Sequence, residues 1–329
     1  MCLVRPCYSV FLLFLFFYLP VQAAEVQVST SVWSSGGQTS WAHNASGLNS
    51  IWGNPTSELI YENIDSKIAE VSIRLPVNNG NMHFSLGGGT IHHGLLVDDD
   101  YVSASGATYY GATVSGAHRI SRTHSDVTGS GLYYLSAEYH PEFFKFNIAS
   151  VPLQLYAGLQ YWKEDYVAQG VRQLECTDST ASNGRTFCNM EGFNGYNNQN
   201  VISNKVIWTT WYLGAKSQLE LSEAMSLRMK VNYSPFTYLS NEDVHHLRSD
   251  LHQNPSFSMT GFGQAIDLQL DWRYHFQDWA EVSLGYRYWD RKVTSGDWYS
   301  NSNFGTSKAP LAHMRTTRKG VTLALNVVF

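Results

Sequence analysis

Long apolar runs are missing from the sequence once the first two dozen residues are passed. Beyond residue 24 no stretch reaches the roughly 20 apolar residues that a transmembrane helix needs. Charged residues are also few, at 15% of the chain, and the net charge of −5 gives no indication of nucleic-acid binding. No Gly-x-Ser-x-Gly segment occurs, which argues against a serine hydrolase with a nucleophile elbow. These absences exclude a helical membrane domain and narrow the choice of enzyme class.

Cysteine is scarce, and the two pairs lie in different contexts. Cys2 and Cys7 fall in the N-terminal segment, whereas Cys176 and Cys188 fall in the body of the chain. Two cysteines of an exported protein are expected to form a disulfide. The surrounding residues are rich in Ser, Thr, Asn and Gly, which indicates an external loop stapled locally and not a metal site.

The N-terminus is typical of a secretory signal peptide. Arg5 precedes an apolar run from Val10 to Leu19, and the small residues Ala23 and Ala24 follow. We therefore predict a signal peptide over residues 1–23 and a single domain over residues 24–329. A retained N-terminal anchor is the alternative.

Aromatic residues are abundant, with 10 Trp, 20 Tyr and 16 Phe. Such a content suits the aromatic girdles of a membrane β-barrel, and it also suits a secreted β-sandwich. Composition alone leaves both open.

Period-two alternation decides between them. From Ile266 to Phe276 every second residue is apolar and the residues between are polar. The same rhythm recurs over residues 69–75, 226–233, 282–288 and 321–329. In a membrane strand one face meets lipid and the other a polar lumen, so the repetition predicts an all-β fold, a transmembrane antiparallel β-barrel. The terminal Phe329 is typical of barrels assembled in the bacterial outer membrane.

Connection lengths set the predicted topology. Short turns are predicted near Asn78–Asn81, Asn147–Val151, Leu221–Ala224 and Gln277–Ala280. Long polar loops are predicted near Gly36–Pro55, Val97–Ser125, Gln173–Asn204, Glu242–Gly261 and Thr294–Arg318. Four short periplasmic turns alternating with five long extracellular loops give ten strands, with both termini in the periplasm.

The inward-facing positions carry charges of both signs, namely Glu70, Arg74, Arg228, Lys230, Asp267, Asp271, Arg273 and Arg287. A ten-stranded barrel is narrow, because water-filled porins need about 16 to 18 strands. We expect these charges to pair and fill the lumen, which disfavours an open channel and assigns function to the external loops.

Two predicted loops carry acids or histidines at spacing i, i+2. Asp98 and Asp100 form one pair, and Asp243 and His245 form the other. In extended backbone each pair shares a face, and two facing pairs could hold a water that the imidazole deprotonates. The alternatives are solvated acidic loops or a weak calcium site at the Asp triplet. No metal site is predicted, since His92-His93 and His245-His246 lack a third ligand at a telling spacing.

These segments resemble the omptins, a family of outer-membrane endopeptidases. The run Tyr233-Ser234-Pro235-Phe236-Thr237-Tyr238-Leu239-Ser240-Asn241-Glu242-Asp243-Val244-His245 is similar to the omptin segment in which Tyr-Ser leads to a catalytic Asp-x-His. Val97-Asp98-Asp99-Asp100-Tyr101 is similar to Val-Asp-x-Asp-Trp, and Ser57-x-Leu59-x-Tyr61 to Ser-x-Leu-x-Trp. Residues Ser121 to Asp126 loosely resemble an omptin Ser-x-His-Pro segment.

The resemblance spans the mature chain and implies a divergent omptin-like barrel with an external catalytic groove. It implies peptide hydrolysis by an Asp243–His245 dyad and an Asp98–Asp100 couple, dependence on bound lipopolysaccharide, and no other cofactor. The expected partners are lipopolysaccharide, outer-membrane lipid and a peptide or protein substrate. The expected state is a monomer in the bacterial outer membrane.

Several positions depart from the omptin pattern. The acids that select basic substrate side chains are missing, because no acid lies between Glu25 and Glu58 and Asn241 stands two residues before the dyad. Of a lipopolysaccharide-binding triad only Lys163 remains. A preference for Arg or Lys is therefore doubtful, and the alternative is a non-catalytic barrel acting as an adhesin or receptor.

Strand parity raises a structural requirement. Val231 and Tyr233 are predicted to face lipid, and Asp243 and His245 share their parity. The third strand has the same conflict between Leu86 and Asp98. A β-bulge resets the face, and we predict bulges at Pro235 and within Gly87–Gly89.

Overall fold

The computed structural model describes residues 25–110, 118–128, 130–148, 151–177 and 188–329. The predicted signal peptide over residues 1–23 lies outside these ranges. Among the described residues no helix is long and apolar enough to cross a membrane. The elements are, in chain order, β1 (Gln27–His43), β2 (Trp52–Val77), β3 (Gly80–Val102), α1 (Ala104–Tyr109), β4 (His118–Val127), β5 (Ser130–Pro141), the 3-10 helix η1 (Glu142–Phe144), β6 (Lys145–Ile148), β7 (Val151–Cys176), β8 (Asn194–Glu220), β9 (Met225–His245), β10 (Phe257–Gln277), β11 (Ala280–Ser302) and β12 (Gly305–Val328).

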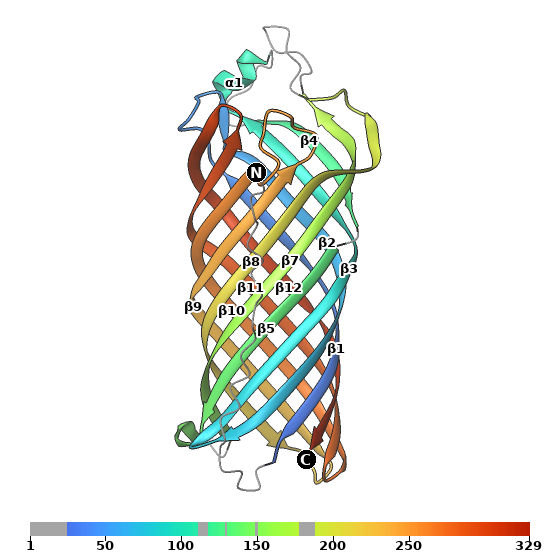
Figure 1. The fold of residues 1–329 in the computed structure, drawn as a ribbon, viewed down its shortest axis with the longest axis vertical. Coiled ribbons are helices and arrows are strands. Elements are labelled where there is room, and N and C mark those ends of the chain that lie inside the picture. Colours follow the sequence, from blue (N-terminus) through green and yellow to red (C-terminus); the bar gives the residue numbers. More distant parts are fainter. Residues whose placement is uncertain (1–24, 111–117, 129, 149–150, 178–187) are drawn as a thin grey trace, which may run out of the picture.

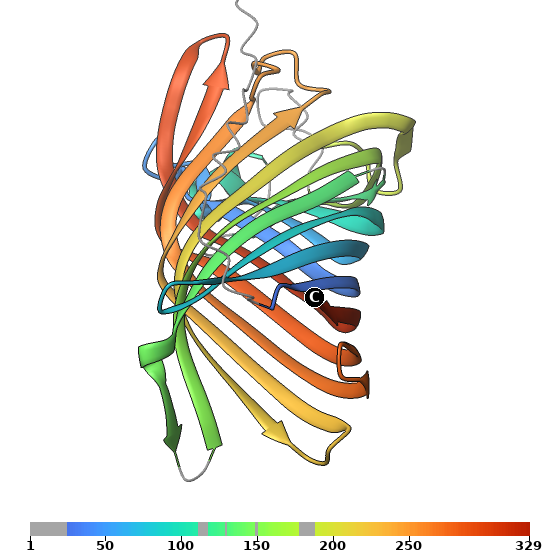
Figure 2. The same cartoon turned by 60° about the horizontal axis from the view of Figure 1, so that its bottom comes forward.

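The strands form one closed antiparallel barrel (Figures 1 and 2). Each strand pairs with its neighbours in the chain, and β1 closes the ring by pairing with β12 as well as β2. β4 and β5 pair with successive parts of both β3 and β7, so they are two segments of one strand that β6 prolongs. Counted in this way the barrel has ten strands, as the turn pattern predicted.

The outer surface of the lower barrel is an apolar belt. Met229, Leu270, Tyr286 and Val321 lie side by side on β9, β10, β11 and β12, and each is exposed by nearly half or more. The alternation is therefore in register between neighbouring strands, so the outward apolar side chains of one strand lie beside those of the next. A belt of this kind on a closed barrel is the surface that meets lipid.

The strands are much longer than a bilayer requires. β2 and β7 have 26 residues each, whereas about 9 to 11 residues span a membrane. The barrel therefore extends well beyond the apolar belt on one side, toward the end that carries α1 (Figure 1). We call this end the upper rim. At the other end Val26 and Phe329 exchange backbone hydrogen bonds, so both described termini lie there.

The predicted long loops are the main error of the sequence analysis, because most of their residues lie in strands. β11 and β12 are joined by Asn303 and Phe304 alone, inside the expected loop Thr294–Arg318. The strand segments above the belt have polar outer faces, so they lack the outward apolar rows that identified the lower segments. The four short turns were predicted correctly where the structure describes them.

β-bulges change which residues face inward. In β9, Phe236 pairs with Trp211 but Tyr233 pairs with Leu213, so the strand has one extra residue at Ser234 and Pro235. Asn232 and Ser234 are buried below this point, and Leu239 and Asp243 are buried above it. The bulge predicted at Pro235 is therefore confirmed.

The bulge in β3 lies elsewhere than predicted. Ile91 pairs with Ser66 and His93 pairs with Asp65, so His92 is the extra residue. Gly87 stays in register, and a Cβ atom there would lie 2.2 Å from the Tyr134 ring. The glycine run serves close packing inside the barrel, and the prediction within Gly87–Gly89 was wrong.

Charged pairs fill much of the lower lumen. Arg287 pairs with Glu70 at 2.9 Å, and Arg228 pairs with Asp271 at 2.7 Å. Glu138 accepts a contact from Lys230 at 2.6 Å. This agrees with the expected pairing of lumenal charges.

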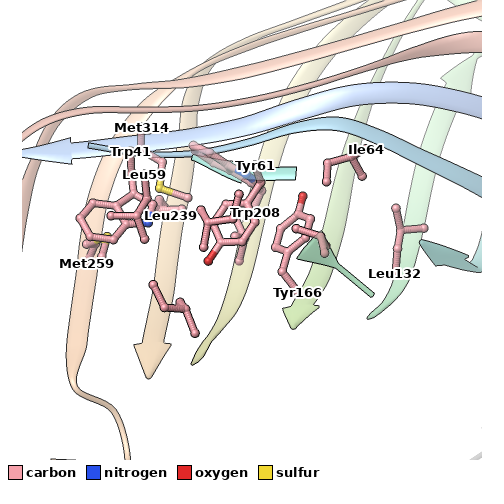
Figure 3. Packing of buried hydrophobic residues seen from close by; sticks show 14 of the residues in the cluster. Trp41, Leu59, Tyr61, Ile64, Leu132, Tyr166, Trp208, Leu239, Met259 and Met314 are labelled. Atoms are coloured by element: carbon pink, nitrogen blue, oxygen red, sulfur yellow. The ribbon is translucent and has the colours of Figure 1, made fainter. Parts of the chain in front are cut away.

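Above these charges the interior is aromatic. Trp289 contacts Trp33 and Trp162 with ring centroids 4.7 and 4.6 Å apart, and Arg291 lies over its ring at 5.0 Å. Higher still, the strands direct a layer of large side chains into one interior space, including Trp41, Leu59, Tyr61, Tyr166, Trp208, Leu239, Met259 and Met314 (Figure 3). The barrel is a packed cylinder along this part of its length, which disfavours a diffusion channel.

Candidate active site at the upper rim

The four residues singled out from the sequence lie on strands and not in loops. Asp98 and Asp100 are near the end of β3, and Asp243 and His245 are at the end of β9. Asp98 lies 12 residues above Leu86 of the apolar belt, or about 40 Å along the strand. The site is therefore well above the membrane-spanning part of the barrel.

The bulges turn both pairs into the barrel. Asp98 pairs across the sheet with Leu59, and Asp243 follows Leu239 and Asn241 on the same face of β9. Leu59, Leu239 and Asn241 are all almost fully buried. Because β3 and β9 stand on different sides of the ring, the two pairs face one another across the interior.

Asp243 and His245 are in direct contact. His245 Nε2 lies 3.1 Å from Asp243 Oδ1, although the two atoms do not meet in hydrogen-bond alignment. Asp243 Oδ2 accepts a hydrogen bond from Asn204 Nδ2 at 3.1 Å. The Asp243 side chain is fully buried and the His245 side chain is 15% exposed, so the imidazole links a buried carboxylate to solvent.

The two pairs interact electrostatically across the barrel interior. Burial, then the negative charge of Asp100, raises the pKa of Asp98 well above its usual value, while His245 acts to lower it. Burial acts to lower the pKa of His245, but Asp243 and then Asp98 outweigh it and the pKa is raised. Each pair therefore lies within the electric field of the other.

Asp100 occupies a different environment from Asp98. Burial raises the pKa of Asp100 to about 6, although the Ser57 hydroxyl across the sheet and the positive charges of His245 and Arg248 act to lower it. Asp98 Oδ1 is buried and has no hydrogen-bond partner in the part of the chain that the structure describes. The couple can therefore retain a proton near neutral pH.

Asp99, between Asp98 and Asp100, lies on the opposite face of β3. It points to the outer face, where Arg122 Nη2 lies 2.6 Å from its carboxylate and Arg119 Nη1 lies 3.5 Å away. The middle residue of the Asp triplet is therefore paired with two guanidinium groups. It is not available to the interior site.

An aromatic wall supports His245, and sequence reasoning did not identify it. Phe257 packs edge-on against the His245 ring at 4.7 Å, and Trp298 packs against Phe257 at 5.1 Å. His43 stacks on Trp298 at 3.9 Å, and burial followed by the charge of His245 lowers its pKa to about 3. No sequence motif marks these residues, because they come from three separate strands.

Two further residues border the site. Tyr61 is fully buried, stacks on Tyr166 at 4.6 Å, and its hydroxyl has no hydrogen-bond partner among the described residues. Arg248 pairs with Asp250 at 2.7 Å and contributes positive charge to Asp98 and Asp100. Tyr61 belongs to the Ser-x-Leu-x-Tyr segment noted above, whereas Arg248 had no signal in the sequence.

The positions next to the dyad are neutral. Asn241 Nδ2 donates to Asn204 Oδ1 at 2.8 Å, and both side chains are almost fully buried. Asn204 therefore bridges Asn241 and Asp243. Among the residues that the structure describes, Asp243 is the only acid in this short chain of hydrogen bonds.

The remaining predicted residues lie away from the site. Lys163 faces outward on β7, where it pairs with Asp165 at 2.5 Å and lies over the Tyr133 ring at 5.4 Å. Its role in lipid binding stays a prediction. Cys176 and Cys188 form a disulfide at the end of β7, with Cα atoms 5.9 Å apart.

Solved structures that match the chain include outer-membrane barrels. The crystal structure of the outer membrane protease OmpT from Escherichia coli matches with a TM-score of 0.66 and 14% identity, over 93% of this chain and 97% of that chain. The translocator domain of the autotransporter NalP from Neisseria meningitidis gives 0.37 and 10%, over 92% and 88%. A Pseudomonas aeruginosa FadL homologue gives 0.24 and 10%, over 94% and 90%.

No protein-family model and no curated protein sequence matches the chain. The likeness to the OmpT structure is one of fold alone at this identity, and it extends over nearly the whole of both chains. The chain therefore has the fold of a transmembrane β-barrel of the kind found in bacterial outer membranes.

Proposed function

We propose that this protein is an endopeptidase of the bacterial outer membrane, with its active site inside the upper rim. The supporting observation is the meeting of two pairs from different strands, Asp98 with Asp100 and Asp243 with His245, through bulges that reverse the face of each strand. The apolar belt supports a membrane location. In this proposal the upper rim faces the cell exterior and both termini face the periplasm.

The proposed chemistry uses a water molecule as the nucleophile. A water between Asp98 and His245 attacks the peptide carbonyl carbon while His245 Nδ1, the ring nitrogen that does not face Asp243, accepts its proton. Asp243 stabilises the resulting imidazolium, and a proton held by the Asp98–Asp100 couple stabilises the oxyanion of the tetrahedral intermediate. The C–N bond breaks as His245 returns its proton to the leaving nitrogen.

The proposed substrate preference is for uncharged side chains at the cleavage point. Asn204 and Asn241 present amides where a site for Arg or Lys would need a carboxylate. Burying a cationic side chain beside them would leave its charge uncompensated. Lipopolysaccharide as an activator and Lys163 as one of its contacts belong to the same proposal.

The test is cleavage of a peptide library by the mature barrel refolded with lipopolysaccharide. His245→Ala is expected to abolish cleavage, and Asp243→Asn is expected to lower it by about 10²- to 10⁴-fold. His246→Ala is the matched control, because His246 is the next residue but bonds to Ser203 at 2.6 Å in an exposed position.

Two results would reject the enzyme. One is a folded wild-type barrel that cleaves no peptide, and the other is cleavage that is unchanged in both site variants. Either result would favour a non-catalytic surface barrel acting as an adhesin or receptor, for which the missing specificity acids already argue.

A further inference from the structure

A second cluster of ionisable side chains lies inside the lower barrel, away from the rim. His83 on β3 pairs directly across the sheet with Glu138 on β5, and His140 is two residues further along β5. Residues i and i+2 of a strand share a face, so the backbone register brings all three side chains together. One ligand atom from each lies within 4.8 Å of the other two.

The hydrogen bonds of the cluster leave ring nitrogens free. Glu138 Oε2 lies 2.9 Å from His140 Nε2, while Glu138 Oε1 accepts from Tyr212 at 2.7 Å and Lys230 at 2.6 Å. His83 Nε2 and His140 Nδ1 are buried and have no hydrogen-bond partner in the described part of the chain. Buried polar atoms are normally paired, so free nitrogens beside a carboxylate indicate room for a ligand.

Space for an ion adjoins the cluster. A cavity of about 150 Å³ is lined by His83, Glu138 and His140 among others. A second cavity of about 450 Å³ shares His83 and Lys216 with the first, and it is also lined by residues of β6 and of the beginning of β7, at the lower end of the barrel. A hydrated cation can therefore approach from that end.

We propose that His83, Glu138 and His140 bind one divalent transition-metal cation of the zinc type. Two imidazoles and one carboxylate form a donor set that suits zinc and its neighbours, whereas magnesium and calcium prefer oxygen ligands alone. The metal takes Glu138 Oε2, since Oε1 is already held by Lys230 and Tyr212. A water from the cavity completes the coordination.

The surrounding charges limit the affinity of this site. Lys230 contacts Glu138, and Lys216 lines the same cavity, so both oppose a dication. We therefore expect weaker binding than in closed sites with four protein ligands. Bound metal links β3 to β5 near the lower end, and this role is independent of the proposed peptidase.

The probe is Co²⁺ titrated into the metal-free barrel in detergent, followed by visible absorption. Wild type is expected to bind one equivalent more than His83→Ala, or to bind it at least tenfold more tightly, as ligand loss in metal sites commonly produces. His275→Ala is the matched control, because His275 is also lumenal and contacts one carboxylate, Glu281 at 3.2 Å. It is expected to bind as wild type does.

Zn²⁺ supplies a second measurement. It is expected to raise the unfolding temperature of wild type and of His275→Ala but not of His83→Ala, because only the folded three-ligand site gains binding energy. His83 is chosen since it is less buried than His140, and Glu138→Gln is the replacement if it does not refold. Equal Co²⁺ stoichiometry and affinity in wild type and both cluster variants would overturn the proposal.

Discussion

Asp243→Asn is the sharpest test of the proposed mechanism, because it removes one charge and almost no volume. Asp243 is fully buried, and its carboxylate lies 3.1 Å from His245 Nε2. At that separation, with an effective dielectric constant of about 20, the pair is worth about 5 kcal/mol when the imidazole is charged. Asn retains an oxygen that can accept the hydrogen bond from Asn204.

The expected loss in kcat/KM is about 10²- to 10⁴-fold, or about 3–5 kcal/mol, because Asn cannot stabilise the imidazolium that His245 forms as the general base. The pH profile should also move. In wild type Asp243 holds the pKa of His245 up against the effect of burial, so activity rises with pH only as this raised pKa is passed. In the variant burial dominates, the pKa of His245 falls, and the rising limb begins at lower pH.

The assay is the initial rate of peptide cleavage between pH 4 and 9, for wild type, Asp243→Asn and the control His246→Ala. A purely structural role for Asp243 would lower the rate at all pH values alike and leave the limb in place. The reasoning is refuted if Asp243→Asn keeps wild-type activity or if its rising limb does not shift toward acid.

Three further predictions follow from the same geometry. Asn241→Asp adds a carboxylate beside the dyad. It should increase cleavage next to Arg or Lys, relative to cleavage next to uncharged residues, by at least about tenfold, which is what one charge-assisted contact contributes. An unchanged cleavage profile of the peptide library would contradict this prediction. Burial raises the pKa of Asp100 from 3.8 to about 6, so the folded state loses stability as pH rises through that range. Asp100→Asn should therefore stabilise the barrel by at most about 3 kcal/mol at pH 8 and hardly at all at pH 4. Thermal unfolding at the two pH values measures this, and equal effects at both would show that ionisation is not the cause. Glu164→Gln should cost about 3–5 kcal/mol in urea unfolding, since it leaves the buried Arg318 guanidinium without the carboxylate that now lies 2.8 Å away; a loss below about 1 kcal/mol would mean that this pair is not needed.

The sequence predicted the lower barrel well because its physics is simple there. Lipid outside and paired charges inside force strict alternation, as in Ile266 to Phe276, and the short turns are the brief interruptions between alternating segments. Ten strands could be counted from these signals. The outward row of β10 also has the exposed apolar side chains that the pattern predicted.

The upper barrel could not be predicted in the same way. Its outer face meets water and its inner face is apolar, so polar residues such as Ser300 and Lys308 were read as loop. The layer of Trp41, Trp208 and Met314 comes from three strands far apart in sequence. Alternation gives the face of each strand but not which strands meet across the interior.

The candidate site lies between these two cases. The spacing of Asp98 with Asp100 and of Asp243 with His245 was visible in the sequence, and so was the need for a bulge at Pro235. The extra residue at His92 was not, because a bulge in a strand has no required residue type. Neighbours such as Phe257 contribute through packing alone, which no local pattern records.

The bulge in β9 explains how the outer face of one strand can be apolar beside lipid while its inner face carries the site above the membrane. Below Pro235 the even residues of β9 are inward and polar, and the odd residues contact lipid. One extra residue moves the odd set inward, where Leu239 joins the apolar layer and Asp243 reaches the site. Without it the strand would direct Glu242 and Val244 inward and place Asp243 in water, where its contact with His245 would be screened. The chemistry at the rim therefore depends on a backbone irregularity eight residues below it as much as on the identity of the reacting side chains.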